Sequence, residues 1–269
     1  MEEYISSVSK LKSFHNWYNL KSPYVKESDV IDSIKGIKVT KISFDLGNLV
    51  DTYVTDKLIG TSTYPALSKK LNKVLHEEGE QELNTWVERF KSQNNYFLVQ
   101  QEHTISLPTV LGTLNVKLRP DIYTLSEVID IKTSKQTLNV GYYENDLQGL
   151  LYCEALDLDI AVYEHFWVSH ATNRVIYKGC VRQNRISKAK IIEVATQFIV
   201  FCQKNGLMNY LLPPAPIDIN SIYPSGKYKD MLVRDIIEKN LPYLKWAIKN
   251  TSYSFSENLV NIVNNLKLK

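Results

Sequence analysis

The stretch "RPDIYTLSEVIDIKTSK", residues 119–135, carries two aspartates nine residues apart and a lysine two residues after the second aspartate. Its Ile and Val content favours two β-strands joined by a central turn. Residues 115–123 and 128–133 are expected to pair as an antiparallel hairpin. Asp121 then lies directly opposite Asp130, with Cβ atoms about 4.5–5.5 Å apart. Two carboxylates placed in this way repel each other, and an ordinary strand pair avoids them.

A divalent cation would remove this repulsion and use both carboxylates as oxygen ligands. Because side chains alternate along a strand, Asp130 and Lys132 share one face of the sheet. Two carboxylates, a metal and a lysine are suited to attack on a phosphodiester. The metal polarises a phosphoryl oxygen and activates water, while Lys132 orients that water or offsets developing charge. Asp-x-Lys alone is also common on solvated edge strands, so the opposed Asp121 carries the prediction.

The next helical stretch, "DLQGLLYCEAL" (146–156), places Gln148 and Tyr152 four residues apart and therefore on one stripe of the helix. If this helix stood alone, Gln148 would be interpreted as a surface residue and Tyr152 as a half-buried core residue. Its position directly after the aspartate–lysine strand makes both side chains candidates for the same site.

The composition is that of an ordinary globular protein. The chain has 269 residues, of which 44% are hydrophobic and 23% charged, enough for one large domain with a small appendage. No apolar run approaches about 18 residues, so no transmembrane helix is expected. The N-terminus lacks the apolar region of a secretory signal, so a cytoplasmic location is predicted. The three cysteines form no CxxC pair and are expected to be reduced thiols: Cys153, Cys180 and Cys202.

The chain order predicts an α/β or α+β fold with one mixed sheet. Helices are expected over 7–20, 46–58, 66–94 (one helix, or two broken near Gly79), 142–156 and 185–204, and β-strands within 96–107, 111–123, 128–133, 160–169 and 175–181. The Pro-rich "LLPPAPID" (211–218) indicates a boundary. The predicted division is a domain over 1–210, a linker over 211–224 and a small basic helical unit over 225–269. Within this unit, the part beyond about Asn250 is expected to be a polar tail.

Together, these motifs resemble the RecB-like branch of the PD-(D/E)xK nuclease superfamily. The family pattern is Gly-x-x-x-His on an early helix, an Asp at a strand end, Asp-x-Lys followed by Thr, and Gln-x-x-x-Tyr on the next helix. The N-terminal "SVSKLKSF" is also similar to the start of that branch, and the order agrees over roughly residues 7–210. The matching residues are Asp121 after Arg119 and Pro120, then Asp130, Ile131, Lys132 and Thr133, then Gln148 and Tyr152.

The resemblance implies an α/β, restriction-endonuclease-like core with a mixed central sheet flanked by helices, and a nuclease dependent on Mg²⁺ or Mn²⁺. It makes Asp121 and Asp130 metal ligands, the Ile131 carbonyl a further ligand, and Lys132 the catalytic lysine. By the same resemblance, Gln148 and Tyr152 line the site and contact DNA or support Lys132, and Lys135 is a further candidate for DNA binding.

The early helix departs from the family pattern. It reads Gly47-Asn48-Leu49-Val50-Asp51, with an aspartate where the family often has a histidine ligand. Aspartate also binds Mg²⁺, so Asp51 is a candidate ligand, although a solvated helix Asp stays open. Glu102 is a weaker candidate. Some RecB-like nucleases hold an iron–sulfur cluster on one N-terminal and three C-terminal cysteines; that pattern is missing here, so no cluster is expected.

The C-terminal stretch 225–250 resembles the small C-terminal motif of exodeoxyribonuclease X-like proteins. Residues 225–269 hold eight Lys or Arg against four Asp or Glu, on a chain whose net charge is +3. Lys227 and Lys229 could bind a phosphate backbone, with exposed aromatic residues stacking on bases. A helical cap with Tyr243 and Trp246 as its own small core is the alternative.

The function favoured by these motifs is a metal-dependent DNA exonuclease of the kind that phages use in recombination, replication or repair. A structure-specific or restriction-like endonuclease is one alternative, and a catalytically silent DNA-binding module on the same fold is another. DNA is the expected partner, and no membrane is. A single-strand annealing or replication protein, and a homo-oligomer, stay open as further partners.

Overall fold

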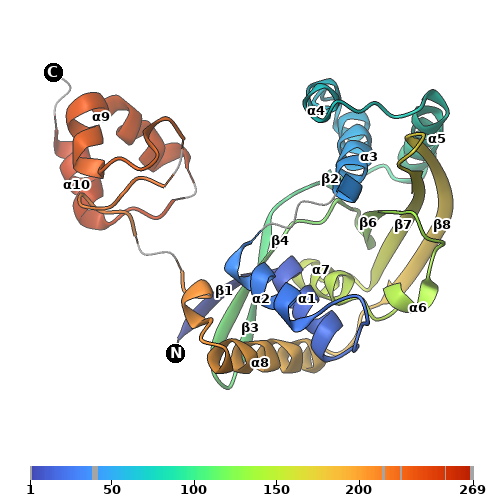
Figure 1. Ribbon diagram of the computed structural model, residues 1–269, viewed down its shortest axis with the longest axis horizontal. Coiled ribbons are helices and arrows are strands. Elements are labelled where there is room, and N and C mark those ends of the chain that lie inside the picture. The colour runs from blue at the N-terminus through green and yellow to red at the C-terminus, as the bar shows by residue number, and fades with distance from the viewer. Residues whose placement is uncertain (1, 38–41, 214–215, 225, 252, 267–269) are drawn as a thin grey trace. The chain divides into compact units, whose positions relative to one another are not determined.

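The computed structural model describes residues 2–37, 42–213, 216–224, 226–251 and 253–266, and divides the chain into two compact units, residues 1–212 and 213–269 (Figure 1). None of the helices in these ranges combines the length and apolar character that crossing a bilayer requires. The helices of the first unit are α1 (Val8–Tyr18), α2 (Glu27–Lys35), α3 (Ile42–Ile59), α4 (Tyr64–Leu71), α5 (Glu77–Gln93), α6 (Val140–Tyr143), α7 (Leu147–Leu156), α8 (Lys188–Lys204) and the 3₁₀ turn η1 (Met208–Tyr210).

The strands of this unit form two sheets rather than one. The larger sheet has the order β2-β5-β6-β7-β8; β6 and β7 are parallel and the other neighbours antiparallel, so it is mixed. The smaller has the order β1-β4-β3, with β1 parallel to β4. The strands are β1 (Glu3–Ser7), β2 (Leu98–Val99), β3 (His103–Thr109), β4 (Gly112–Leu118), β5 (Ile122–Tyr123), β6 (Glu127–Ser134), β7 (Ile160–Ser169) and β8 (Arg174–Asn184).

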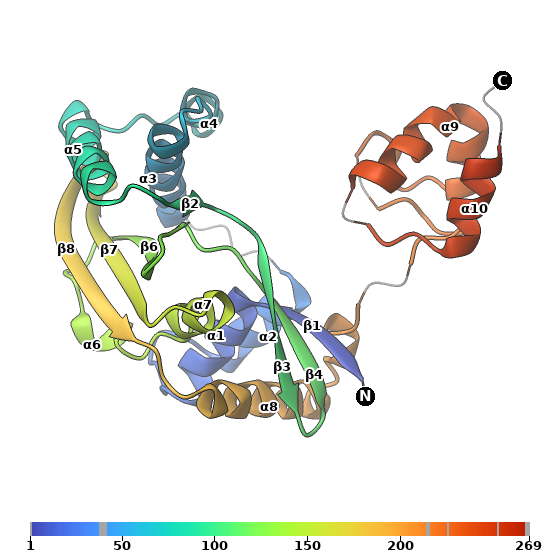
Figure 2. The same ribbon diagram turned by 180° about the vertical axis from the view of Figure 1, so that it is seen from behind.

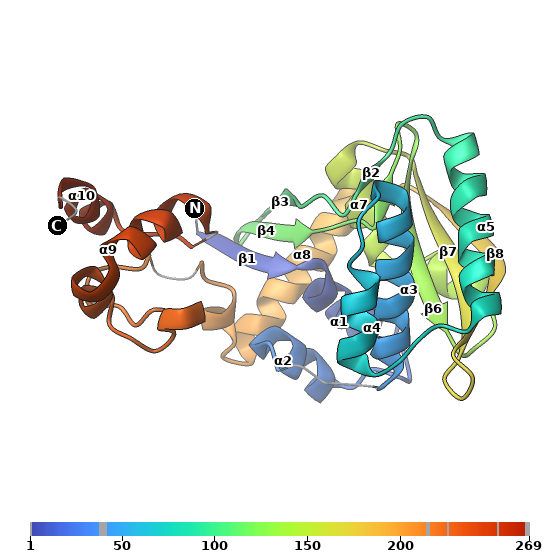
Figure 3. The same ribbon diagram turned by 90° about the horizontal axis from the view of Figure 1, so that it is seen from above.

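Helices cover both faces of the larger sheet, because its strands bury alternate side chains on each side. Tyr163 and its same-face neighbour Ala161 pack in the cluster that includes α1, α7 and α8. Val162 and Phe166 point the other way and pack with α3 and α5. Figure 3 shows α3 and α5 side by side on their face, and Figure 2 shows α7 on the other side of β7. This arrangement confirms the predicted restriction-endonuclease-like α/β fold class.

The predicted hairpin register is confirmed, but the hairpin is shorter than expected. Ile122 pairs with Ile129 and Tyr123 with Val128, which is the alignment that sets Asp121 one position beyond the ladder, facing Asp130. The expected strand over 115–123 is wrong in its length: β4 ends at Leu118 in the other sheet, and β5 begins at Ile122. Pro120 lies in the gap, where its missing N–H costs no ladder hydrogen bond.

Other element predictions need correction. The expected long helix over 66–94 is two helices, but the break lies at residues 72–76 and not at Gly79, which is buried in α5. Asn72 adopts a left-handed conformation (φ 50°) that ends α4. Strand β1 and helix α2 were not foreseen. The helix predicted over 142–156 is divided into α6 and α7 at Asp146, which caps α7.

The second unit has its own core. Its elements are η2 (Gly226–Tyr228), α9 (Val233–Asn250), which is kinked at Asn240 before Pro242, and α10 (Glu257–Asn265). The polar tail expected beyond about Asn250 contains a helix, α10, whose Leu259 is fully buried. Residues 214–215, 225, 252 and 267–269 of the predicted linker and basic unit lie outside the described residues. The remainder of the predicted linker is largely packed: Leu211 in the first core, and Ile217 and Tyr223 in the second.

Candidate active site

Asp121 lies at the edge of the larger sheet where β5 begins. Because β5 extends no further than Ile122, the side chain of Asp121 takes the place of a strand carbonyl: its Oδ2 accepts the Ile131 N–H at 2.7 Å. This hydrogen bond fixes the carboxylate beside β6, next to Asp130. The two aspartates are therefore brought together by the sheet edge, as the register requires.

Asp130 and Lys132 form an ion pair on one face of β6. Asp130 is only 4% exposed, and its Oδ2 pairs with Lys132 Nζ. Lys132 Nζ also donates to Gln148 Oε1 at 3.1 Å. Burial alone would lower the pKa of Lys132, but the charges of Asp130 and Asp121 outweigh it and raise the pKa above its ordinary value. Lys132 is thus a permanent cation at this site.

Gln148 connects the carboxylate, the lysine and the helix. Its Nε2 donates to Asp130 Oδ1 at 2.9 Å and to Tyr152 Oη at 2.8 Å. Tyr152 is buried, and its hydroxyl donates to the Arg119 carbonyl at 3.3 Å, which ties α7 to the segment that precedes Asp121. The i, i+4 pair predicted from the sequence therefore lies in the same hydrogen-bond network as Asp130 and Lys132.

Helix α7 can bring Gln148 this close because of Gly149. The Gly149 N–H donates to Tyr163 Oη at 3.0 Å. A Cβ at position 149 would lie against Tyr163 Oη and Gln183 Oε1, and 2.8 Å from the Cβ of Ala161. Asp146 caps the helix by accepting the Gln148 N–H at 3.1 Å. The cap and the missing side chain together set the height of α7 above the sheet.

Asp51 lies on α3, which covers the face of the larger sheet opposite to α7. A Cβ at Gly47 would lie 2.7 Å from Thr133 Oγ1, so α3 packs closely on β6 at this glycine, and Asp51 lies one turn further along the same side. The carboxylate of Asp51 accepts from Gln100 Nε2 at 3.1 and 3.3 Å. Gln100 N–H in turn donates to the Asp121 carbonyl at 3.0 Å.

Burial and neighbouring negative charges raise the pKa of two of these carboxylates, Asp121 and Asp51. Burial raises the pKa of Asp121 well above its ordinary value, and the charges of Asp130 and Asp51 raise it further. Burial, followed by the charge of Asp130, also raises the pKa of Asp51. Such a group of like charges is stabilised by a cation.

The donor atoms fit a hard cation, since carboxylate and carbonyl oxygens are the ligands of Mg²⁺. Nevertheless, across the parts of the chain that the structure describes, no three Asp, Glu, His or Cys side chains are arranged to hold a metal ion as they stand. Two of the carboxylate oxygens have partners within the protein: Lys132 Nζ lies against Asp130 Oδ2, and the Ile131 N–H donates to Asp121 Oδ2.

Lys12 and Gln100 are site residues that the sequence analysis did not single out. Lys12 Nζ donates to Asp146 Oδ2 at 2.6 Å and to Gln148 Oε1 at 3.1 Å. Burial lowers the pKa of Lys12, as does the charge of Lys132, whereas Asp146 acts in the opposite direction. A weak signal was present: a lysine directly follows Leu11, a buried residue of the helix expected over 7–20.

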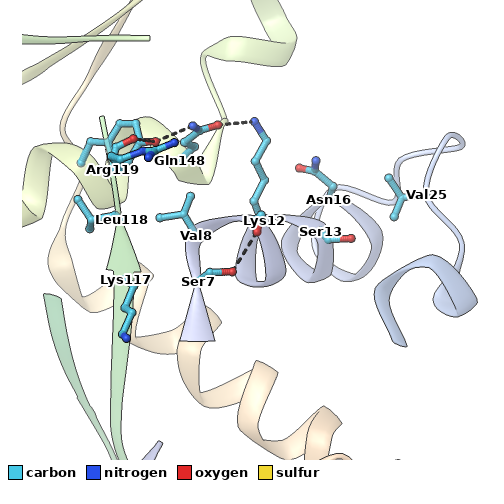
Figure 4. A pocket seen from close by; sticks show the side chains of 12 residues that line it. Ser7, Val8, Lys12, Ser13, Asn16, Val25, Lys117, Leu118, Arg119 and Gln148 are labelled. Atoms are coloured by element: carbon cyan, nitrogen blue, oxygen red, sulfur yellow. Dashed lines mark hydrogen bonds between the residues drawn. The ribbon is translucent and has the colours of Figure 1, made fainter. Parts of the chain in front are cut away.

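A cavity of about 570 Å³ adjoins Gln148 and Tyr152. Figure 4 shows Lys12 extending from α1 toward Gln148, with Arg119 beside Gln148. Three basic residues and several hydroxyl groups give the cavity an anion-binding character. The residues that line it are Ser7, Val8, Ser9, Lys12, Ser13, Asn16, Val25, Lys117, Leu118, Arg119, Gln148 and Tyr152.

The remaining predicted residues lie elsewhere. Glu102 is exposed in the turn before β3, while the neighbouring Gln100, not Glu102, contacts Asp51. Lys135 is exposed after β6, and its carbonyl accepts from Trp167 Nε1 at 2.9 Å. Lys227 and Lys229 are exposed in the second unit, where Lys227 Nζ lies 5.4 Å from the centroid of the Tyr228 ring. The roles assigned to these lysines stay predictions.

Comparisons with known proteins give weak likenesses. No family model matches the chain, and no curated protein does. The structure is similar to that of SSO0001 (17% identity, 60% of this chain and 87% of that one, TM-score 0.35). It is also similar to a phage-related exonuclease from Haemophilus somnus (12%, 73% and 95%, TM-score 0.31) and an alkaline exonuclease from Laribacter hongkongensis (13%, 62% and 95%, TM-score 0.28). At these scores the likenesses carry no weight for function.

Proposed function

We propose that this protein is a metal-dependent DNA exonuclease that hydrolyses phosphodiester bonds, of the kind that phages use in recombination, replication or repair. The observation that supports it most is the meeting of Asp51, Asp121 and Asp130 with Lys132 at the sheet edge. Carboxylates whose charges disfavour one another, beside a permanent cation, match the requirements of phosphodiester hydrolysis.

In this proposal, Mg²⁺ or Mn²⁺ is held by Asp51, Asp121, Asp130 and the carbonyl of Ile131. When bound, the ion supplies Lewis acidity toward a phosphoryl oxygen and lowers the pKa of a bound water. The raised pKa values of Asp51 and Asp121 support this assignment: burial is the larger cause and the charge of Asp130 adds to it, and a dication would stabilise the ionised form of both carboxylates.

Lys132 acts as a cationic donor and not as a base. Because the neighbouring carboxylates raise its pKa, the ammonium stays protonated at neutral pH. It can therefore orient the attacking water through a hydrogen bond and offset the negative charge that develops on the phosphoryl group. Gln148 holds the Asp130 carboxylate in place through its Nε2.

The cavity beside Gln148 would receive the nucleic acid backbone. Lys117 and Arg119 in its lining would contact the phosphates, because Arg or Lys side chains with hydroxyl groups are the usual partners of phosphate oxygens. In the second unit, Lys227 and Lys229 would add phosphate contacts, with the half-exposed Trp246 available for stacking on a base.

The test compares end-labelled linear DNA with covalently closed circular DNA, each with and without Mg²⁺. We expect degradation of the linear form alone, and only with Mg²⁺ or Mn²⁺. Asp130→Asn and Lys132→Ala should each lower the rate by about 10²–10³-fold with the fold retained. Asp157→Asn, which changes an exposed aspartate at the C-terminal end of α7, is the matched control and should cleave at the wild-type rate.

The other outcomes are equally informative. Cleavage of circles would favour an endonuclease, and cleavage of neither form would favour a silent DNA-binding module. If Asp130→Asn retained more than about a tenth of the wild-type rate, the site would be misassigned. We also expect Ca²⁺ to suppress activity and the purified protein to be colourless; a visible absorption band with stoichiometric iron would contradict the expectation that no iron–sulfur cluster is bound.

A further inference from the structure

The side-chain amide of Gln148 lies between two cations on one side and two oxygen acceptors on the other. Its Oε1 accepts from Lys132 Nζ and from Lys12 Nζ, each at 3.1 Å. Its Nε2 donates to Asp130 Oδ1 at 2.9 Å and to Tyr152 Oη at 2.8 Å. All the hydrogen-bonding capacity of the amide is directed at the site.

This set of partners allows one orientation of the amide. An ammonium can only donate and a carboxylate can only accept. Rotation of the amide by 180° would turn its NH₂ group toward two ammonium groups and its oxygen toward Asp130. The orientation therefore follows from the chemistry of the neighbours and not from the assignment of atoms in the coordinates.

Lys132 alone would not hold the Gln148 amide in this orientation throughout the reaction. In the proposed reaction its Nζ turns to the attacking water and the phosphoryl group, so its bond to Gln148 Oε1 weakens when the carboxylate must be held most firmly. Lys12, in contrast, does not act on the attacking water or the phosphoryl group in the proposed reaction. It comes from a different element, α1, and its bond to Asp146 Oδ2 at 2.6 Å fastens it to the start of α7.

We propose that Lys12 is a positioning residue, which keeps the Gln148 amide turned so that its NH₂ group holds Asp130 while Lys132 acts on the substrate. This inference rests on the proposed function for its catalytic consequence, but the orientation of the amide does not depend on it. The resemblance to RecB-like nucleases does not suggest this role for Lys12, because the similarity over residues 7–14 rests on serines and a leucine.

A simpler role must be separated from this one. Asp146 is 1% exposed, and Lys12 neutralises it. Removing Lys12 leaves a buried carboxylate without its cation, which destabilises a protein whatever the active site does. A double substitution separates the two roles, because Asp146→Asn removes the charge that needs neutralising.

The experiment is a cycle of Lys12→Met, Asp146→Asn and the double variant in the full chain, with kcat and KM measured on linear DNA. We expect Lys12→Met to lower kcat by about 10–100-fold, as loss of an orienting partner commonly does, with KM changed less than about twofold. The same loss should separate the double variant from Asp146→Asn alone, and Lys12→Arg should recover most of kcat. Lys10→Met, on the same helix and outside the cavity, is the control.

Equal kcat in the double variant and Asp146→Asn would overturn the proposal, since Lys12 would then serve only to neutralise Asp146. A change in KM alone would also overturn it and make Lys12 a substrate-binding residue.

A second readout does not require activity. The side-chain amide protons of Gln148, identified by their absence in Gln148→Glu, should give two separate NMR signals that exchange slowly in the wild type. In Lys12→Met these signals should move toward those of a free glutamine amide. Unchanged signals would refute the positioning role. A shift of the signals in a protein without nuclease activity would support the positioning and refute the proposed function.

Discussion

The carboxylate of Asp121 accepts the Ile131 N–H while it lies among the negative charges of Asp130 and Asp51. The hydrogen bond stabilises the sheet edge, whereas burial and repulsion destabilise it whenever all three groups are ionised. An amide at this position could keep an oxygen for the Ile131 N–H and would carry no charge. Function and stability therefore make opposite demands on residue 121.

Asp121→Asn should raise the melting temperature of the metal-free protein while abolishing cleavage. The physical reason is the removal of one ionised group from a buried cluster of like charges. Each kcal/mol relieved corresponds to roughly 2–4 °C for a domain of this size, so a rise of at least about 2 °C at pH 7 is expected. Calorimetry in the presence of a chelator would measure it.

Mg²⁺ supplies the control for this substitution. It should raise the melting temperature of the wild type and leave that of Asp121→Asn nearly unchanged. If the substitution instead lowered the melting temperature of the metal-free protein, the hydrogen bond to Ile131 would outweigh the repulsion.

At the scale of elements, Asp56 fastens the end of α3 to the beginning of α4. Its buried carboxylate accepts from Thr61 Oγ1 at 2.6 Å, from Thr63 N–H at 2.6 Å and Oγ1 at 2.8 Å, and from Tyr64 N–H at 2.6 Å. Burial alone would raise the pKa of Asp56, but these hydrogen bonds to the charged form outweigh it and lower the pKa.

Asp56→Asn should therefore destabilise the protein in a pH-dependent way. A depressed folded-state pKa contributes stability that is present above the unfolded-state value, near about 4, and is lost as the pH falls through the folded-state value. We expect a loss of about 1–3 kcal/mol at pH 7. Urea denaturation from pH 7 to pH 3 should show the difference from the wild type shrinking at the acidic end; a constant difference would indicate a purely steric effect.

The distance of α7 from the sheet depends on the missing side chain at Gly149. Gly149→Ala places a methyl group against Tyr163 Oη and Gln183 Oε1, and overpacking of this kind costs about 1–3 kcal/mol. Helix α7 should move outward and carry Gln148 with it, so that the cleavage rate falls even at temperatures where the variant is fully folded. Rate and melting temperature measured together check this.

Gly141→Ala is the matched control, because a Cβ at that position in α6 meets only Asn139 Oδ1, at 3.8 Å. It should change neither the melting temperature nor the rate appreciably. Wild-type activity in folded Gly149→Ala would show that the site tolerates a displaced α7.

At the scale of the whole molecule, each unit has its own hydrophobic core. A chain that ends after Leu212 keeps the site residues from Lys12 to Tyr152 and the buried Leu211. We expect it to fold and to cleave, but to bind DNA less tightly. Each lost phosphate contact removes about 0.9 from the slope of log K against log salt, so loss of Lys227 and Lys229 could remove up to about 2.

Binding titrations of the truncated and full-length chains at several salt concentrations would measure this slope. An unchanged slope with a lower melting temperature would make the second unit a structural cap. Insolubility of the truncated chain would likewise indicate that the second unit is a structural cap.

Sequence alone predicted what local pattern and strand register determine. The pairing of Ile122 with Ile129, and hence the approach of Asp121 to Asp130, follows from side-chain alternation and turn position. Gln148 and Tyr152 follow from helical periodicity. Their chemical roles are still untested.

What the sequence did not predict depends on contacts between distant segments. Lys12 looks like any polar residue on an amphipathic helix until α1 packs beside α7. Gln100 reaches Asp51 from a backbone with φ 49°, which β-propensity would not suggest for a Gln after a strand. The interruption of the expected strand at Pro120 and the assignment of β4 to a second sheet were not predicted.

The N-terminal strand β1 also has a consequence for how the chain is synthesised. Glu3 pairs with Thr113, and the Ile5 N–H donates to the Leu211 carbonyl at 2.6 Å. Strand β1 must therefore wait for partners that are synthesised later, and it completes its hydrogen bonds only after residue 211 has emerged. Until β4 has emerged, β1 is an unpaired strand, and Tyr4, which is buried in the folded protein, is still exposed. Chaperone capture during translation should accordingly concentrate on the N-terminal segment.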